Sequence, residues 1–324
     1  MTTAPVGGGL VSLFGVDPAT YQPHPVHQLD RTYVETNCYT DVLIELLHAR
    51  GDEPLAAMGF TVRTDFEGDQ WTFFKPPPGD LEALFGVDIH EMQPYRPVHD
   101  QIAEQIASGN TMIVEVDSWY LPDTAATSYR TEHVKTSIAP ESIDRAAEVL
   151  RYFHNASLHE LEGDDYRGVF RLKTLDAEVL PPYTELVRLD AGLRLDGEEL
   201  RAASRDLLRQ HLRRRPGANP FERFAAALER DLPALLAGDT AGYHAYAFAT
   251  VRMAGSSFEL CASHLDWLLG DRAQSASEPL REIVDGCKLL SLKLARRRPF
   301  DSRPLVTEMG RAWEQAMHRL DDLV

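Results

Sequence analysis

The apolar positions in the first half of the chain predict a helix followed by a sheet. Val42, Leu43 and Leu46 recur at helical spacing after Asn37, a residue that can cap a helix, and Gly51 can end it. A second helical pattern covers residues 98–108. Strand-like runs follow at residues 111–116, 133–139, 149–155 and 168–172.

The second half of the chain has helical spacing almost throughout. Gly-, Pro- and Asp-containing turns separate five predicted helices, at residues 197–212, 220–236, 241–269, 278–296 and 304–323. Loops this short are typical of antiparallel neighbours in a helix bundle. We therefore expect an α+β protein with three parts: an irregular arm at 1–30, a domain of helices and strands at 31–180 and a helical bundle at 190–324.

Charge and length limit the function classes. The chain has 324 residues and a formal net charge of -17, which argues against binding to nucleic acid or to an anionic membrane, because both need a basic surface. The N-terminus has no basic segment typical of a signal peptide, and no window is apolar enough to span a membrane. These features predict a cytoplasmic protein.

The spacing of the three cysteines suits neither disulfide bonds nor a zinc site, and one of them is placed as a catalytic thiol would be. Cys38, Cys261 and Cys287 are odd in number and widely spaced, so neither a disulfide framework nor a metal site is expected. Cys38 falls in the first turn of the predicted helix, where the helix dipole and unpaired N–H groups favour the thiolate. The alternative is a buried cysteine that packs as a small apolar residue.

Two later residues complete a possible catalytic set. His133 opens one predicted strand, and Asn155 ends the next one along the chain. If the two strands pair antiparallel, Asn155 can lie beside His133 and hold its imidazole as a general base. Cysteine, then histidine, then an amide is the chain order of papain-like cysteine enzymes.

Three segments carry a family resemblance. Glu35–Asp41, Val114–Pro122 and Thr131–His133 are similar to a papain-like domain, in particular to the N-terminal domain of the butirosin-type acyltransferase. The whole chain also resembles a bacterial family whose members are often encoded beside amino-acid:carrier-protein ligases. The resemblance implies Cys38 as nucleophile, His133 as base and Asn155 as the residue that orients the base.

The resemblance also suggests binding residues. Asp117 matches the Asp that precedes an aromatic-Leu-Pro stretch in the butirosin-type domain and would anchor substrate or loop, although capping of the turn after a strand is an equal alternative. Tyr120 could line the cleft. Papain-type enzymes have an oxyanion-hole Gln several residues before the cysteine, and this chain has Thr32, Tyr33 and Val34 in that region. The Cys38 N–H and the Asn37 side chain are therefore the expected oxyanion donors.

The implied activity is acyl transfer. An aminoacyl or similar group would pass from a carrier-protein thioester through an acyl-Cys38 intermediate to an amine acceptor, with no bound cofactor or metal; the carrier would supply its phosphopantetheine arm. A cysteine peptidase or amidase with the same triad, or a non-catalytic carrier-binding adaptor, are the alternatives.

Carrier docking could involve the arginine runs. Carrier proteins are generally acidic, so the basic clusters that include Arg213, Arg214, Arg296 and Arg297 could dock one, although cations at helix C-termini also complement the dipole. The charge is unevenly shared along the chain. Residues 1–175 contain 12 Lys and Arg against 27 Asp and Glu, a net -15, and residues 176–324 contain 21 against 23, a net -2.

Overall fold

A computed structural model describes residues 9–172 and 182–324 of the protein. Its residues separate into two compact units. The sheet unit comprises the described parts of Met1–Pro25, Cys38–Glu53 and Leu81–Arg194, and the helical unit comprises Val26–Asn37, Pro54–Asp80 and Leu195–Val324. The fold is α+β, with an antiparallel sheet and a helical C-terminal region, as the sequence predicts.

The sheet unit is built around an antiparallel sheet with the strand order β2-β7-β3-β4-β5-β6, and β1 pairs with the far end of β4. Its strands are β1 (Val11–Ser12), β2 (Asp88–Met92), β3 (Thr111–Asp117), β4 (Lys135–Asp144), β5 (Val149–His154), β6 (Ser157–Glu162) and β7 (Thr184–Arg188). Its α-helices are α1 (Cys38–Arg50), α3 (Val98–Ala107) and α4 (Gly163–Val169), and α2 (Pro78–Phe85) begins in the helical unit. Short 3₁₀ turns are η3 (Ser118–Tyr120) and η4 (Pro122–Thr124).

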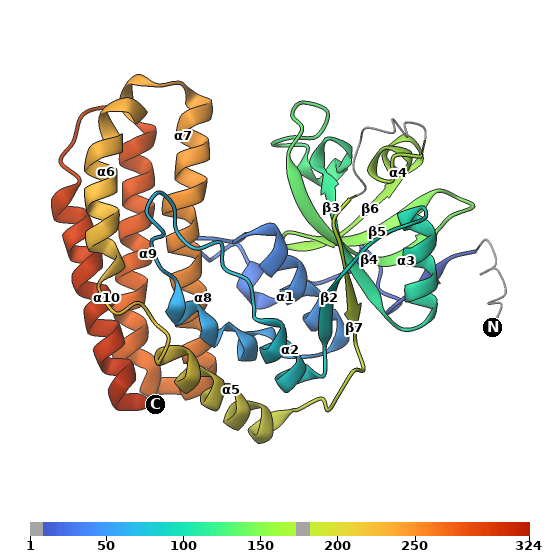
Figure 1. Ribbon diagram of the computed structural model, residues 1–324, viewed down its shortest axis with the longest axis horizontal. Coiled ribbons are helices and arrows are strands. Elements are labelled where there is room, and N and C mark those ends of the chain that lie inside the picture. The colour runs from blue at the N-terminus through green and yellow to red at the C-terminus, as the bar shows by residue number, and fades with distance from the viewer. Residues whose placement is uncertain (1–8, 173–181) are drawn as a thin grey trace. The chain divides into compact units, whose positions relative to one another are not determined.

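Two apolar layers cover the sheet, because successive side chains of a strand point to opposite faces. Val114, Ile138 and Tyr152 belong to one buried cluster with Ile102 of α3. Phe153, which has the opposite orientation to Tyr152, faces α1. Figure 1 shows α1 and α3 on opposite sides of strands β4 and β7.

Contacts made by Tyr21 confirm which face α1 covers. The Tyr21 ring lies 5.7 Å from that of Phe153, and its hydroxyl donates to Glu45 of α1 at 2.5 Å. Both contacts lie within the sheet unit. The Phe153 side of the sheet is therefore the α1 side.

Most of the predicted elements are present, and one is wrong. The expected strand at Gly168–Leu172 is instead the end of helix α4 and the turn that follows it. Tyr166 and Val169 are three residues apart and both enter the core below α3, which is the spacing of a helix. The strands β1, β2, β6 and β7 were not expected, and β1 lies within the arm predicted to be irregular. The predicted domain end at residue 180 lies outside the described residues.

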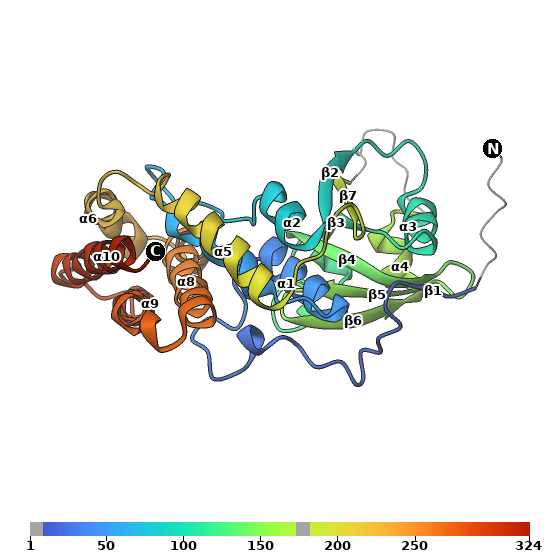
Figure 2. The ribbon, with the colours of Figure 1, turned by 90° about the horizontal axis from the view of Figure 1, so that it is seen from below.

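The helical unit matches the predicted bundle closely. Figure 2 shows α6, α8, α9 and α10 nearly end-on as one cluster. The elements are η2 (Pro54–Arg63, a 3₁₀ segment), α5 (Gly197–Leu212), α6 (Pro220–Ala237), α7 (Thr240–Ala247), a π-helical turn (Phe248–Arg252), α8 (Met253–Leu269), η6 (Gly270–Ala273), α9 (Gln274–Ala295) and α10 (Arg303–Leu323). The single helix expected at 241–269 is thus interrupted by a π-helical turn.

Two earlier segments belong to this bundle although the sequence suggested otherwise. Glu259 of α8 accepts hydrogen bonds from the backbone N–H groups of Thr32 and Tyr33 at 3.0 and 2.9 Å. Trp71 is buried against the rings of Phe221 and Phe258. These contacts explain why residues 26–37 and 54–80 group with the helices. No helix in the described ranges is long and apolar enough to cross a membrane.

Candidate active site

Cys38 is the first residue of α1, which confirms its predicted place in the first turn. It is partly exposed, whereas Cys261 and Cys287 are buried. The first N–H groups of a helix have no partner within the helix, so they can stabilise negative charge near Cys38. The preceding residue, Asn37, donates from its side-chain amide to the carbonyl of Phe74 at 3.0 Å. That bond occupies one of the two amide N–H groups that the oxyanion role would use.

Two contacts fix the direction of α1 along the sheet. Near its start, the Tyr39 hydroxyl donates to Glu185 at 2.6 Å, and Glu185 is paired with Ile113 of β3. At its end, Arg50 donates to the carbonyl of Leu189, just beyond β7. Because β7 and β3 are antiparallel, α1 begins toward the end of the sheet where β3 finishes and β4 starts.

That end of the sheet carries an aspartate–histidine pair. Asp117 is the last residue of β3, and its Oδ2 lies 2.6 Å from Nδ1 of His133, two residues before β4. A carboxylate can only accept, so Nδ1 carries the hydrogen and Nε2 is left as the basic nitrogen. The Trp119 ring stacks on the imidazole with centroids 4.5 Å apart and planes 9° apart.

The Asp117 side chain is itself held in place. Its Oδ1 accepts the backbone N–H of Trp119 at 3.0 Å and caps the turn η3. Asp117 therefore fulfils the capping alternative foreseen from the sequence and also fixes the histidine tautomer. Since residues 112, 114 and 116 face the α3 side, Asp117 has the opposite orientation and faces the α1 side. No hydrogen bond joins Cys38 to His133 in the described part of the chain.

Asn155 does not hold His133. It occupies the two-residue turn between β5 and β6 with a φ of 47°, a left-handed conformation that Asn tolerates well. Ala139 pairs with Phe153 in the antiparallel strands β4 and β5, so Asn155, two residues after Phe153, lies near Ser137. Ser137 is four residues away from His133. The structure thus gives the role of imidazole partner to Asp117, and Asn155 forms the hairpin turn.

A second aspartate–histidine pair lies in the interior and was not foreseen. His154 is 1% exposed; its Nδ1 lies 2.5 Å from Asp123, and its Nε2 lies 2.8 Å from the Thr136 hydroxyl. Tyr152 also donates to Asp123. Burial raises the pKa of Asp123, but the hydrogen bond and charge of His154 outweigh this and hold that pKa below its usual range.

The hydrogen bonds of this buried network link a hydroxyl, an imidazole and a carboxylate in the same sequence as a catalytic triad. Substrate cannot reach the network, because Thr136 and His154 are both buried. It ties the loop after β3 to strands β4 and β5. One indication of this network was present in the sequence: His154 and Tyr152 are two residues apart in a predicted strand, so their side chains point to the same face of the sheet. Its role in this structure is to hold that loop.

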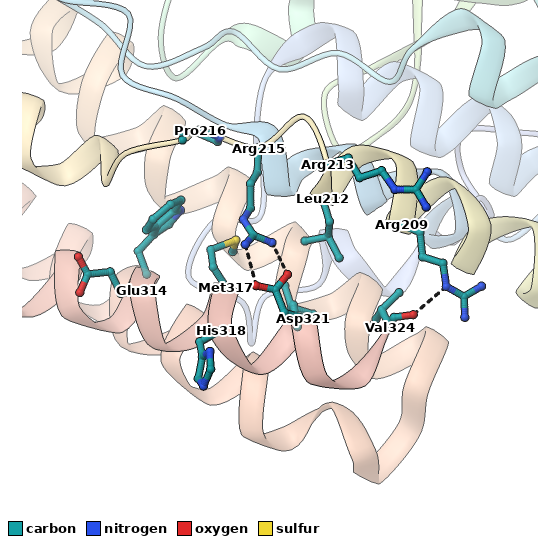
Figure 3. A pocket seen from close by; sticks show the side chains of 13 residues that line it. Arg209, Leu212, Arg213, Arg215, Pro216, Glu314, Met317, His318, Asp321 and Val324 are labelled. Carbon is teal, nitrogen blue, oxygen red and sulfur yellow. Dashed lines mark hydrogen bonds and ion pairs between the residues drawn. The ribbon is translucent and has the colours of Figure 1, made fainter.

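The remaining predicted residues lie elsewhere. Tyr120 is packed against Gly168 of α4, with the Arg130 guanidinium 5.3 Å from its ring, so it supports the loop. In the helical unit, Arg214 and Arg296 are exposed, and Arg297 donates to the carbonyl of Leu236 at 3.5 Å. Arg213 lines a pocket of this unit (Figure 3). Within residues 9–172 and 182–324 no group of side chains has the arrangement of a metal site.

The structure defines an α+β protein in which a cysteine-initiated helix packs on an antiparallel sheet and a helical region follows. The chain belongs to the DUF1839 family: the DUF1839 N-terminal domain matches residues 22–189, and the DUF1839 C-terminal domain matches residues 197–322. The boundary between these matches falls where β7 ends and α5 begins. A search of curated proteins gave no match.

Proposed function

We propose that the protein is a cysteine-dependent acyltransferase with Cys38 as nucleophile, His133 as base and Asp117 as the residue that orients the base. The observation that carries this is the Asp117–His133 pair, which fixes Nε2 as the basic atom on the α1 side of the sheet, at the end where α1 begins. Catalytic hydrogen bonds are often unformed in enzymes without substrate, so the missing Cys38–His133 bond is compatible with the role.

The first half of the reaction forms an acyl-enzyme. The Cys38 thiol gives its proton to His133 Nε2, and the sulfur attacks the carbonyl carbon of a thioester. N–H groups of the first turn of α1 stabilise the oxyanion. The tetrahedral intermediate collapses, the donor thiol leaves with the proton from His133, and the acyl group remains on Cys38 as a thioester.

The second half transfers the acyl group to an amine. His133 removes a proton as the amine nitrogen attacks the acyl-Cys38 carbonyl, and the Cys38 thiolate leaves and is reprotonated. An amide forms from a thioester, so the overall reaction is downhill. In this proposal the donor is a carrier protein loaded through its phosphopantetheine arm, as the resemblance to the butirosin-type domain suggests.

Hydrolysis is the second candidate, and one observation favours it. The His133 side chain is 66% exposed, so water reaches the base without any lid. Water in place of the amine would give a free acid and make the protein a thioesterase, peptidase or amidase with the same residues.

The test is the intact mass of the protein after mixing with a panel of aminoacylated carrier proteins. We expect an adduct of acyl mass on the wild type and none on Cys38→Ser. Release of the acyl group only when an amine is added indicates transfer, and release in buffer alone indicates hydrolysis. Cys38→Ser retaining the adduct, or a wild type that never acquires one, would contradict the proposal and favour a carrier-binding adaptor.

A further inference from the structure

The loop at residues 118–132 joins the two residues of the proposed base pair, since it begins directly after Asp117 and ends directly before His133. It also carries Trp119, whose main chain is held from both sides. Its N–H donates to Oδ1 of Asp117 at 3.0 Å, and its carbonyl accepts the N–H of Arg130 at 3.2 Å. The conformation of this loop therefore decides where the Trp119 ring lies.

A buried carboxylate bonds the loop to the sheet. The Asp123 side chain, in η4, is 7% exposed and accepts hydrogen bonds from Tyr152 and His154 of β5. His154 in turn meets the hydroxyl of Thr136, in β4, at 2.8 Å. Asp123 thus bonds the loop to β5 directly and to β4 through His154.

The position of η4 reaches the imidazole of His133 through η3. The Thr124 hydroxyl, in η4, donates to the carbonyl of Ser118 at 3.2 Å, so η4 folds back on η3. Trp119, in η3, stacks on the His133 ring with planes 9° apart. The His133 side chain is 66% exposed, and within the described ranges this stack and the hydrogen bond to Asp117 are the contacts that hold its ring.

We propose that Asp123 is a positioning residue for the base. By bonding η4 to the sheet it fixes η3 and the Trp119 ring, and so keeps the His133 imidazole in the orientation in which Nδ1–H meets Asp117. Asp123 bonds to the α3 side of the sheet, whereas the base lies on the α1 side, so its hydrogen bonds matter and its charge does not. The effect on catalysis rests on the proposed function, but the effect on the imidazole does not.

Two substitutions of Asp123 separate its hydrogen bonds from its charge. Asp123→Ala removes both bonds to β5. Asp123→Asn removes the charge and can keep both bonds: its oxygen accepts from Tyr152, its NH₂ donates to Nδ1 of His154, and Nε2–H donates to the Thr136 hydroxyl, which can accept as well as donate.

Glu141→Ala is the matched control for the loss of a buried carboxylate. Glu141 is fully buried in the same sheet and accepts from the Ser12 hydroxyl at 2.6 Å and from the N–H of Gly15 at 2.9 Å. In the described part of the chain no hydrogen bond joins its side chain to the loop. A general loss of stability should therefore affect this variant as much as Asp123→Ala.

The first measurement is the tautomer of His133 in the full-length protein labelled with ¹⁵N-histidine, at pH 9, where imidazoles are ordinarily neutral. Ring ¹⁵N shifts show which nitrogen carries the hydrogen, and His133→Gln assigns the signal. We expect the Nδ1–H tautomer in the wild type, in Asp123→Asn and in Glu141→Ala, and a mixture of both tautomers in Asp123→Ala.

The second measurement is the rate of acyl-Cys38 formation from a loaded carrier protein. Asp123→Ala should lower the rate at saturating donor about tenfold and change the half-saturating concentration less than about twofold, because a small displacement of a catalytic group slows the chemical step. Asp123→Asn and Glu141→Ala should stay within about twofold of the wild type.

Three results would overturn the proposal: the wild-type tautomer in Asp123→Ala, the same change in Glu141→Ala, or an equal change in Asp123→Asn, which would make the charge the cause. If the wild type never acquires an acyl group, the proposed function fails, and the tautomer comparison alone decides the role of Asp123. If Asp123→Ala does not fold, Tyr152→Phe replaces it. That variant removes one of the two bonds and should show a smaller fraction of the second tautomer, and a wild-type signal would count against the proposal.

Discussion

Replacing Asp117 by Asn tests the central feature of the proposed site. Oδ1 of Asp117 accepts the Trp119 N–H, so an Asn in the same position would keep its oxygen there and turn its NH₂ group toward His133. An NH₂ group can only donate, and Nδ1 of the imidazole would then have to accept. The hydrogen would move to Nε2, which is the nitrogen that must receive the proton of Cys38.

The expected loss in acyl transfer is about 100-fold, which corresponds to about 2.7 kcal/mol in the barrier. A similar exchange in a buried catalytic triad costs about 10⁴-fold. The smaller value is expected here because the side chains of His133 and Asp117 are 66% and 30% exposed, so water can compensate in part. Trp119 still stacks on the imidazole in the variant, so the ring should keep its position and lose only its tautomer.

The assay is the rate of acyl-Cys38 formation by quenched-flow and intact mass, with the best donor of the carrier panel. Glu115→Gln is the matched control, because Glu115 lies two residues earlier on the same side of β3 and pairs with Lys135 at 2.6 Å. Among the described residues it has no hydrogen bond or ion pair with His133. We expect the control to stay within about threefold of the wild type. Equal rates for Asp117→Asn and Glu115→Gln, with both proteins folded, would refute the assignment of Asp117.

Two further predictions concern thiol access and pH. Iodoacetamide at pH 7 should label Cys38 before Cys261 and Cys287, because these two thiols are buried and burial raises the pKa of each to about 12. Peptide mass spectrometry measures the labelling rates of the three cysteines. Equal rates would contradict the structure. Burial lowers the pKa of His264 to about 4, below the value of about 6.5 in an unfolded chain, so the stability this histidine contributes is complete above pH 6.5 and is lost as the pH falls toward 4. Between pH 7 and 5 the wild type should lose about 2 kcal/mol more in urea unfolding than His264→Gln. Parallel losses in the two proteins would show that His264 does not titrate in this way.

The sequence by itself determined the local elements and the place of the nucleophile. Helix α5 has the predicted bounds, and α1 begins at Cys38 and is followed by Gly51, as expected. Helical spacing, capping residues and Gly or Pro breaks act within a few residues, so they can be recognised without knowledge of the fold. The same holds for β3 and β5, whose apolar runs are bounded by turn residues.

Only the tertiary structure decided which distant residues meet. The partner of His133 is Asp117 and not Asn155, because the pairing of β3 with β4 brings the end of one strand beside the start of the other, while Asn155 is used to turn a hairpin. Residues 26–37 and 54–80 likewise join the helices through Glu259 and the buried Trp71. Strand register and burial are set by contacts between residues tens to hundreds of positions apart, and a local sequence pattern does not specify those contacts.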